Sequence, residues 1–219
     1  MKLKMMNRNW TGLLITFCGL DGSGKTTLID ALCQYIIEAT NITPHIIKQP
    51  SNIVRRSEIF RSFIDHKNYN NYDYRAMSLF AVSDRLQQSS KLILPLLQKG
   101  EVVICDRYYY SALVNMRAYG LTNDKWIYEI AQYIPKPDLS IFLDVSYQEA
   151  IRRVKNRIEE RNRYIDDRFE MKLQNEFMLI SKEVDGVIIP SNDSVDIAVD
   201  LIQKEFDKVY FKRGIVNYE

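Results

Sequence analysis

Eight residues near the start of the chain have the types and spacing needed to bind a phosphate chain. They read Gly19-Leu20-Asp21-Gly22-Ser23-Gly24-Lys25-Thr26 and match G-x-x-x-x-G-K-[ST] at every defined position. The glycines let successive backbone N–H groups point at phosphate oxygens, the lysine contacts the β- and γ-phosphates, and the hydroxyl ligates Mg²⁺. The pattern predicts nucleotide binding by Gly19, Asp21, Gly22, Ser23, Gly24, Lys25, Thr26 and Thr27.

The sequence on either side of this loop favours nucleotide binding over a plain turn. The apolar run Leu13 to Cys18 precedes the loop, and an amphipathic pattern begins at Lys25. The loop therefore joins a buried strand to the N-terminus of a helix, where the partial positive charge attracts an anion. The alternative is a glycine-serine turn with a solvent-facing lysine.

An acidic and a basic residue, Asp106 and Arg107, follow a second apolar run, Val102 to Cys105. Ligands of open parallel sheets bind at the carboxyl ends of the strands, so both side chains are expected to face the nucleotide. The carboxylate can hold Mg²⁺, and the guanidinium can bind an acceptor phosphate through two parallel hydrogen bonds. An internal ion pair that ends the strand is the alternative.

The other motifs favour a small-molecule kinase over other enzymes with this loop. A GTPase needs a D-x-x-G segment and an N-K-x-D segment, whereas Asp106 is followed by Arg107-Tyr108 and the nearest match to the second is Thr122-Asn123-Asp124-Lys125. A motor or remodelling ATPase needs an acidic pair on the second strand and large accessory domains. This chain of 219 residues shows neither feature, and its size suits a small-molecule kinase.

Composition limits the class further. With 46% hydrophobic residues the chain can bury its own core, so we expect one domain over residues 1–219. A net charge of +2 argues against nucleic acid as the main partner, and the apolar runs are too short to span a membrane. Cys18, Cys33 and Cys105 lack metal-ligand spacing and are expected to be free thiols in a reducing compartment, the cytoplasm.

Short apolar runs alternate with amphipathic segments along the chain. Such alternation predicts a three-layer α/β fold with about five parallel strands and helices on both faces. The expected strands are Leu13–Cys18, His45–Ile47, Val102–Cys105, Leu139–Leu143 and Val187–Ile189, and the expected helices are Lys25–Ala39, Tyr74–Leu97, Tyr128–Tyr133, Tyr147–Arg157, Asp167–Val184 and Val195–Tyr210. The charged window 156–168 is either a small mobile lid or a solvated helix surface.

Five segments, taken together and in order, resemble the thymidylate kinase family of P-loop kinases. They cover about residues 12–210: Gly19 to Thr27, Leu79 to Arg85 (similar to L-F-x-A-x-R), Asp106-Arg107-Tyr108 with Ser111, Pro135 to Leu139, and Asp167 to Glu170. The resemblance implies the P-loop NTPase fold and transfer of the γ-phosphoryl group of ATP to thymidylate (dTMP), with Mg²⁺ held by Thr26 and Asp106. It also implies a homodimer.

The resemblance also implies substrate contacts. Asp21 is expected near the deoxyribose, Phe80 stacked on the base, and Arg85 on the base or phosphate, although Phe80 has core packing as an alternative. Arg55 or Arg56 is expected to clamp the acceptor phosphate. The expected substrate-binding residues are Asp21, Arg55, Phe80, Arg85, Arg107 and Ser111.

Members of this family carry a catalytic arginine in either the phosphate loop or the lid. Because Gly22-Ser23-Gly24 contains no basic residue, a lid arginine is implied, and the candidates are Arg153, Arg157, Arg161 and Arg163. Arg157 is the first choice because it is expected to end the helix before the lid. The expected catalytic residues are Lys25, Asp106, Arg107 and Arg157.

Two segments differ from the family pattern and leave the acceptor open. Gln49-Pro50-Ser51 stands where E-P-G or F-P is common, and Val114-Asn115-Met116 stands where A-Y-Q is common. Another deoxynucleoside monophosphate or a nucleoside is therefore an alternative acceptor. A nucleotide-binding regulator without catalysis is the alternative from a different class.

Overall fold

The computed structural model describes residues 2–65, 69–192 and 194–212. Its sheet contains β1 (Leu13–Cys18), β2 (His45–Lys48), β3 (Val102–Asp106), β4 (Leu139–Asp144) and β5 (Val187–Pro190), in the order β2-β3-β1-β4-β5. Every neighbouring pair is parallel. The predicted parallel sheet is confirmed, and the predicted strand ends differ from the observed ones by at most one residue.

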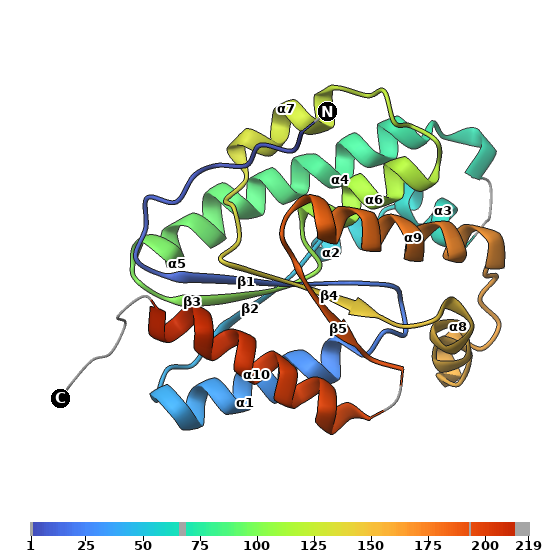
Figure 1. Ribbon diagram of the computed structural model, residues 1–219. Coiled ribbons are helices and arrows are strands. Elements are labelled where there is room, and N and C mark those ends of the chain that lie inside the picture. The colour runs from blue at the N-terminus through green and yellow to red at the C-terminus, as the bar shows by residue number, and fades with distance from the viewer. Residues whose placement is uncertain (1, 66–68, 193, 213–219) are drawn as a thin grey trace.

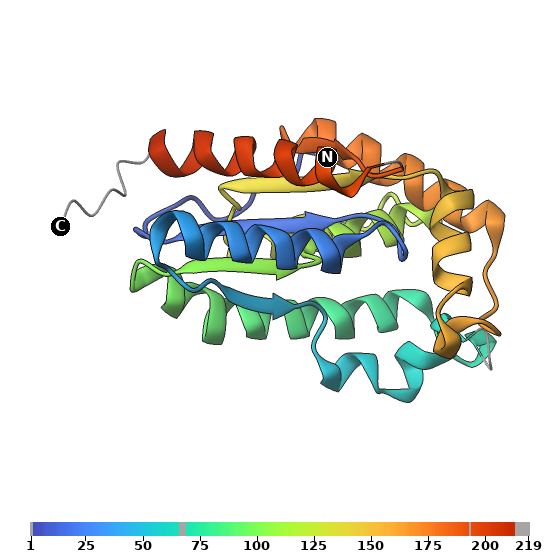
Figure 2. The same ribbon diagram turned by 90° about the horizontal axis from the view of Figure 1, so that it is seen from below.

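Helices cover both faces of the sheet, as Figures 1 and 2 show. On one face lie α1 (Lys25–Thr40) and α10 (Val195–Lys212), which contact each other. The other face carries α4 (Tyr74–Gln88), α5 (Leu94–Gln98), α6 (Tyr109–Ala118), α7 (Trp126–Ile130) and α9 (Asp167–Glu183). The predicted layering is therefore confirmed.

The central strand β1 explains why the strands read as unbroken apolar runs. Leu13, Ile15 and Phe17 pack into the core beneath α1 and α10, whereas Leu14 and Cys18 pack into the core on the opposite face. All six residues of the strand are buried. Because side chains alternate between two buried faces, no polar alternation remains in the sequence.

The structure differs from the sequence prediction in several helices. The expected helix Tyr74–Leu97 is interrupted by a π-helical turn, Ser89–Ile93, before Pro95 in the second position of α5. A proline inside a helix removes an N–H donor and crowds the preceding turn, which a local change of winding relieves. The helix expected to end at Arg157 ends at Lys155.

Some helices were not predicted. They are α2 (Asn52–Arg55), α3 (Glu58–Ile64) and α6, together with the 3₁₀ turns Tyr69–Asn71 and Ile158–Glu160. The helix expected over Tyr128–Tyr133 is formed by the end of α7 and the 3₁₀ turn Ala131–Tyr133. Eight of the ten residues of α6 are buried, so it has no polar face to give a helical period.

The segment expected to be a lid lies between two capped helices. The Ser146 side chain accepts a hydrogen bond at the start of α8 (Tyr147–Lys155), and the Asp166 side chain accepts two at the start of α9. Between them residues 156–166 contain a single 3₁₀ turn and lie beyond the carboxyl ends of the strands (Figure 1). Within the described residues, no helix is long and apolar enough to cross a membrane.

Candidate active site

The phosphate loop adopts backbone conformations that require glycine. Gly22 and Gly24 have φ of 84° and 89°, in the left-handed region. A Cβ atom on Gly22 would lie 2.2 Å from the carbonyl oxygen of Ala150 in α8, whereas one on Gly24 would meet nothing within 4 Å. The loop is thus packed against α8 at Gly22 and open at Gly24, where α1 begins.

Lys25 lies folded over this loop. Its ammonium donates to the carbonyl oxygens of Leu20 (2.6 Å) and Gly19 (3.2 Å) and to Oγ of Ser23 (3.3 Å). The residue is only 8% exposed. Burial first, and then the charge of Arg107, lower the pKa of Lys25 to about 7, although Asp21 and Asp106 act in the opposite direction.

We expect nucleotide binding to be coupled to protonation of Lys25. Phosphate oxygens stabilise the ammonium form, so a lysine with a pKa near 7 takes up a proton when ATP binds above that pH. Affinity for ATP should then fall by up to about tenfold per pH unit above pH 7. Calorimetry at pH 8 in two buffers of different ionisation enthalpy measures the uptake.

Lys25→Arg is the control for this experiment, because arginine keeps its charge at pH 8. The variant should bind ATP without the uptake that the wild type shows. Equal binding heats in the two buffers for the wild-type protein would contradict the coupling.

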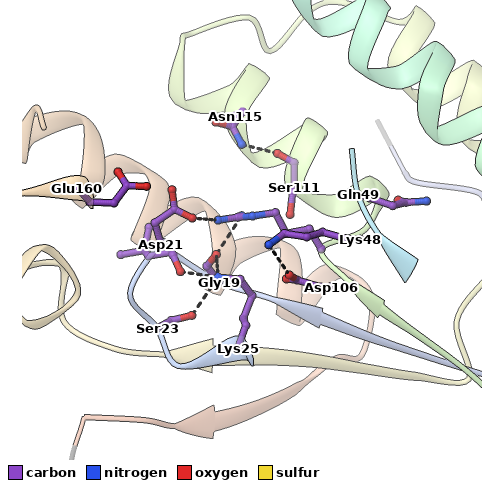
Figure 3. Close-up of polar contacts among 12 residues, drawn as sticks. Gly19, Asp21, Ser23, Lys25, Lys48, Gln49, Asp106, Ser111, Asn115 and Glu160 are labelled. Carbon is purple, nitrogen blue, oxygen red and sulfur yellow. Dashed lines mark hydrogen bonds and ion pairs between the residues drawn. The ribbon is translucent and has the colours of Figure 1, made fainter. Parts of the chain in front are cut away.

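Asp106, at the end of β3, has the properties of a cation ligand. Its Oδ1 is buried without a hydrogen-bond partner among the described residues, and its Oδ2 lies 3.5 Å from Nζ of Lys48 (Figure 3). Thr26 is exposed at the second position of α1. The described part of the chain has no cluster of three His, Cys, Asp or Glu residues that could hold a metal. Thr26 and Asp106 together fit Mg²⁺, because this ion takes few protein ligands and completes its coordination shell with phosphates and water.

Two arginines from different parts of the chain donate hydrogen bonds to the carboxylate of Asp21. Its Oδ1 accepts a short hydrogen bond from Arg107, whose other nitrogen donates to the Gly19 carbonyl oxygen at 3.1 Å. Its Oδ2 accepts from Arg163 in the lid segment at 3.1 Å. Burial raises the pKa of Asp21, but the charges of Arg107, Lys25 and Arg163 outweigh it and hold the pKa far below its usual range.

Two cavities open beside the phosphate loop. The larger, about 340 Å³, is called here the arginine cavity because Arg55, Arg85, Arg107, Arg157 and Arg163 are among its lining residues. The smaller, about 280 Å³, is called the loop cavity because it lies against the phosphate loop. Its lining residues are Gly22, Ser23, Gly24, Thr27, Leu28, Arg153, Arg157, Ser191, Ser194, Val195 and Ala198. Both sizes are in or near the range of small-molecule sites.

The structure brings most of the predicted substrate-binding residues together. Asp21, Arg55, Arg85, Arg107 and Ser111 all line the arginine cavity. Arg55, and not the exposed Arg56, faces it, with its guanidinium held by the carbonyl oxygens of Pro50 (2.7 Å) and Gln49 (3.0 Å).

Phe80 lies outside the lining of the arginine cavity. Its side chain packs against the small apolar cluster that contains Val54 and Met77. Residues five positions apart on a helix lie about 140° apart around its axis, so Phe80 and Arg85 leave α4 in different directions. Ala81 occupies the cavity wall one turn before Arg85.

The candidate lid arginines lie in different places. Arg157 lines both cavities, Arg153 only the loop cavity and Arg163 only the arginine cavity. Arg161 is exposed and lines neither. Arg157 has extended backbone just beyond the end of α8.

Several residues of the arginine cavity were not assigned to it from the sequence. They are Lys48, Glu170 and the aromatic residues Phe60, Phe63, Tyr74, Tyr119 and Phe169. Tyr74 stacks on Tyr119 with ring centroids 3.6 Å apart. Lys48 ends a strand whose carboxyl end meets the site, which is a signal that the sequence carried.

The two segments that differ from the family pattern have different positions. Asn115 lines the arginine cavity and donates to the Ser111 carbonyl oxygen at 2.6 Å (Figure 3). Gln49 is fully buried, and its side chain points away from Asp21 (Figure 3). Of the two differences, only Asn115 is placed to affect a ligand directly.

Glu170 is a buried carboxyl group beside Asp21. Burial and the Asp21 charge raise its pKa to about 7, against the opposing effects of Arg163, Arg107 and Lys25. Because the folded-state value lies above the ordinary 4.5, the group adds stability below pH 4.5 that is lost as pH rises through 7. We expect Glu170→Gln to be more stable than the wild type at pH 8, by on the order of 2 kcal/mol once partial solvent exposure is allowed for.

Urea unfolding at pH 5 and pH 8 checks this expectation. Glu159→Gln is the control, because Glu159 is an exposed acid in the segment just before α9. If the stability difference between Glu170→Gln and the wild type were the same at both pH values, the buried titration would be excluded.

A phosphate loop after the central strand, an acid-base pair after its neighbour and two adjoining cavities define a P-loop kinase of small molecules. Comparison with known proteins makes this more specific. The thymidylate kinase family profile matches residues 17–202. The chain therefore belongs to the thymidylate kinase family.

Individual relatives agree with this assignment. The chain is 37% identical to a probable thymidylate kinase of Pyrococcus horikoshii over 151 residues, which cover 67% of this chain and 71% of the relative. It is 30% identical to a probable thymidylate kinase of Staphylothermus marinus, over 91% of both chains. It is also 30% identical to a thymidylate kinase of Dictyostelium discoideum, over 92% of this chain and 87% of the relative. The expected family and phosphotransferase class are confirmed.

Proposed function

We propose that this chain transfers the γ-phosphoryl group of ATP to the phosphate of dTMP, giving ADP and dTDP. The observation that carries the proposal is the position of Arg157, which lines both the loop cavity and the arginine cavity. A donor in the first and an acceptor in the second would meet beside this guanidinium. The proposal treats residues 1–219 as one kinase domain with residues 156–168 as its lid.

The loop cavity is the proposed ATP site. The backbone N–H groups of Gly22 to Lys25 would bind the β- and γ-phosphates at the N-terminus of α1. Gly19, Asp21, Ser23 and Thr27 complete the loop. Thr26 and Asp106 would hold Mg²⁺, which supplies charge neutralisation at the phosphates when bound.

The arginine cavity is the proposed acceptor site. Arg55 and Arg107 offer paired donors to a phosphate, and Asp21 offers an acceptor to a sugar hydroxyl. Arg85 is only 4% exposed, and its Nε has no partner in the part of the chain that the structure describes. A side chain that only donates fits the carbonyl edge of thymine. Burial and then Arg107 lower the pKa of Arg85 to about 10, so it stays charged at neutral pH.

Transfer needs no general base, because the acceptor phosphate is already ionised. An acceptor oxygen forms a bond to the γ-phosphorus as the bond from that phosphorus to the bridging oxygen of ADP breaks. Lys25, Arg107 and Arg157 would stabilise the charge that builds on the transferring group. Their fixed positions, and the exclusion of water by the lid, would supply the rate enhancement.

The test is an ADP-release assay with ATP and a panel of dTMP, dUMP, dCMP, UMP and thymidine. Transfer to dTMP well above the ATP-only rate supports the proposal. A higher kcat/KM with another acceptor would correct the substrate and direct attention to Asn115. Thermal stabilisation by ATP without product from any acceptor would show a binding protein instead of a kinase.

We also propose a homodimer in the cytoplasm. Leu79 and Leu92, on the helices that cover the sheet, are 44% and 49% exposed and would be covered by a second copy. All three cysteines are free thiols, as a reducing compartment requires. Light scattering after size exclusion would measure the mass, and a mass of one chain at micromolar concentration would contradict the dimer.

A further inference from the structure

Arg163 is a lid arginine whose side chain turns inward. Its side chain is only 17% exposed, whereas its neighbours Arg161 and Asn162 are exposed. One of its nitrogens lies 3.1 Å from Oδ2 of Asp21, and the other lies 3.4 Å from Glu160 within the same turn. One side chain thus joins the lid to the phosphate loop, 142 residues earlier in the chain.

The partner of Arg163 is fixed and charged. Asp21 is held from its other side by Arg107, which is itself bound to the Gly19 carbonyl oxygen. Its pKa lies far below the usual range, so the carboxylate is ionised at any pH at which the protein works. Besides Glu160, which lies in the same turn, Glu170 is an acid close to Arg163. With a pKa raised to about 7, it is partly protonated at neutral pH and is the weaker competitor.

This contact lies at one wall of the arginine cavity. Arg163, Tyr164, Ile165 and Asp166 all line that cavity, so this part of the lid is its wall. Asp21 lines the same cavity. A carboxylate has about four lone-pair positions, so a sugar hydroxyl can bind Asp21 while Arg163 remains in place. The lid and a bound acceptor would then share one anchor.

We propose that Arg163 is a positioning residue that latches the lid over the arginine cavity through Asp21, so that water is kept from the γ-phosphoryl group during transfer. The contact itself is a property of the ligand-free chain, and its effect on transfer rests on the proposed function. Arg163 acts through the lid and is distinct from Arg157, which lies between the two cavities.

The first test is amide hydrogen exchange of residues 157–166 in the ligand-free protein. Breaking a partly buried charged contact should make exchange in Arg163→Gln about fivefold faster. Arg163→Lys, which keeps the charge but not the planar fork, should restore part of the protection. Asp21→Asn should match Arg163→Gln, and the double variant should be no faster than either single one. Arg161→Gln is the matched control and should exchange as the wild type does.

The second test measures how often the enzyme loses phosphate to water. In Arg163→Gln the ratio of ATP hydrolysis to transfer should rise about fivefold, with the KM for ATP changed less than twofold. Wild-type lid exchange in Arg163→Gln would overturn the latch, as would an equal increase in Arg161→Gln. If Arg163→Gln does not fold, Arg163→Lys and Asp21→Asn carry the same exchange readout. If the wild type phosphorylates no acceptor, the proposed function fails while the exchange result still decides the latch.

Discussion

Arg157→Ala is expected to reduce kcat for transfer from ATP to dTMP by about 10³-fold, at the lower end of the range for arginines that stabilise phosphoryl transfer. The structure supports this because Arg157 lines both cavities, and the transferring group must pass between them. The dissociation constant for ATP should change less than about fivefold, since an exposed arginine adds little to ground-state binding. Rapid-quench measurement of single turnovers, with binding measured separately, distinguishes the two effects.

Arg161→Ala is the matched control for Arg157→Ala. Arg161 has the same charge and lies in the same segment, but it is exposed and lines neither cavity. Its kcat should stay within about twofold of the wild type, as for most changes on a surface away from the site. A loss of ATP affinity equal to the loss of kcat in Arg157→Ala would assign this residue to binding and not to the transition state.

The order of the elements could be predicted because the central strands β1, β3 and β4 are short apolar runs that are buried on both faces. Similar burial hid helix α6 from the sequence analysis. A helix that is buried all round has no polar face, so Tyr109–Ala118 lacks the 3.6-residue period by which helices are recognised.

The candidate site also has parts that the sequence reveals and parts that only the fold creates. Gly19 to Thr27 are contiguous, so their chemistry is visible in the sequence. The contact of Asp21 with Arg163 joins residues 142 positions apart, and only the fold creates it. The raised pKa of Glu170 likewise depends on burial beside Asp21, which no local pattern shows.

The position of Phe80 outside the cavity lining could have been expected from the sequence alone. The L-F-x-A-x-R pattern separates its phenylalanine and arginine by four positions, which is about one helical turn, whereas Phe80 and Arg85 are five apart. At four positions before Arg85 this chain has Ala81, and the structure places Ala81 on the cavity wall. The aromatic surfaces of the cavity come instead from other segments, including Tyr74 and Tyr119.

Gly22→Ala is expected to destabilise the ligand-free protein by about 3 kcal/mol, which combines the strain of a left-handed residue with overpacking. Gly22 has φ of 84°, and its added Cβ would lie 2.2 Å from the Ala150 carbonyl oxygen. That oxygen belongs to the backbone of α8, so it cannot turn aside as a flexible side chain would. For a chain of this size the change corresponds to roughly 10 °C in Tm. Thermal unfolding without nucleotide measures it.

Gly24→Ala separates the two causes. Gly24 has nearly the same φ, 89°, but a Cβ there would meet nothing within 4 Å. This variant carries only the conformational cost, about 1 kcal/mol or roughly 3 °C. The difference between the two variants therefore measures how tightly the phosphate loop is packed against α8, the helix that leads into the lid. Equal shifts in Tm would mean that the loop moves away from α8 at little cost, and that α8 does not hold the loop in its phosphate-binding shape.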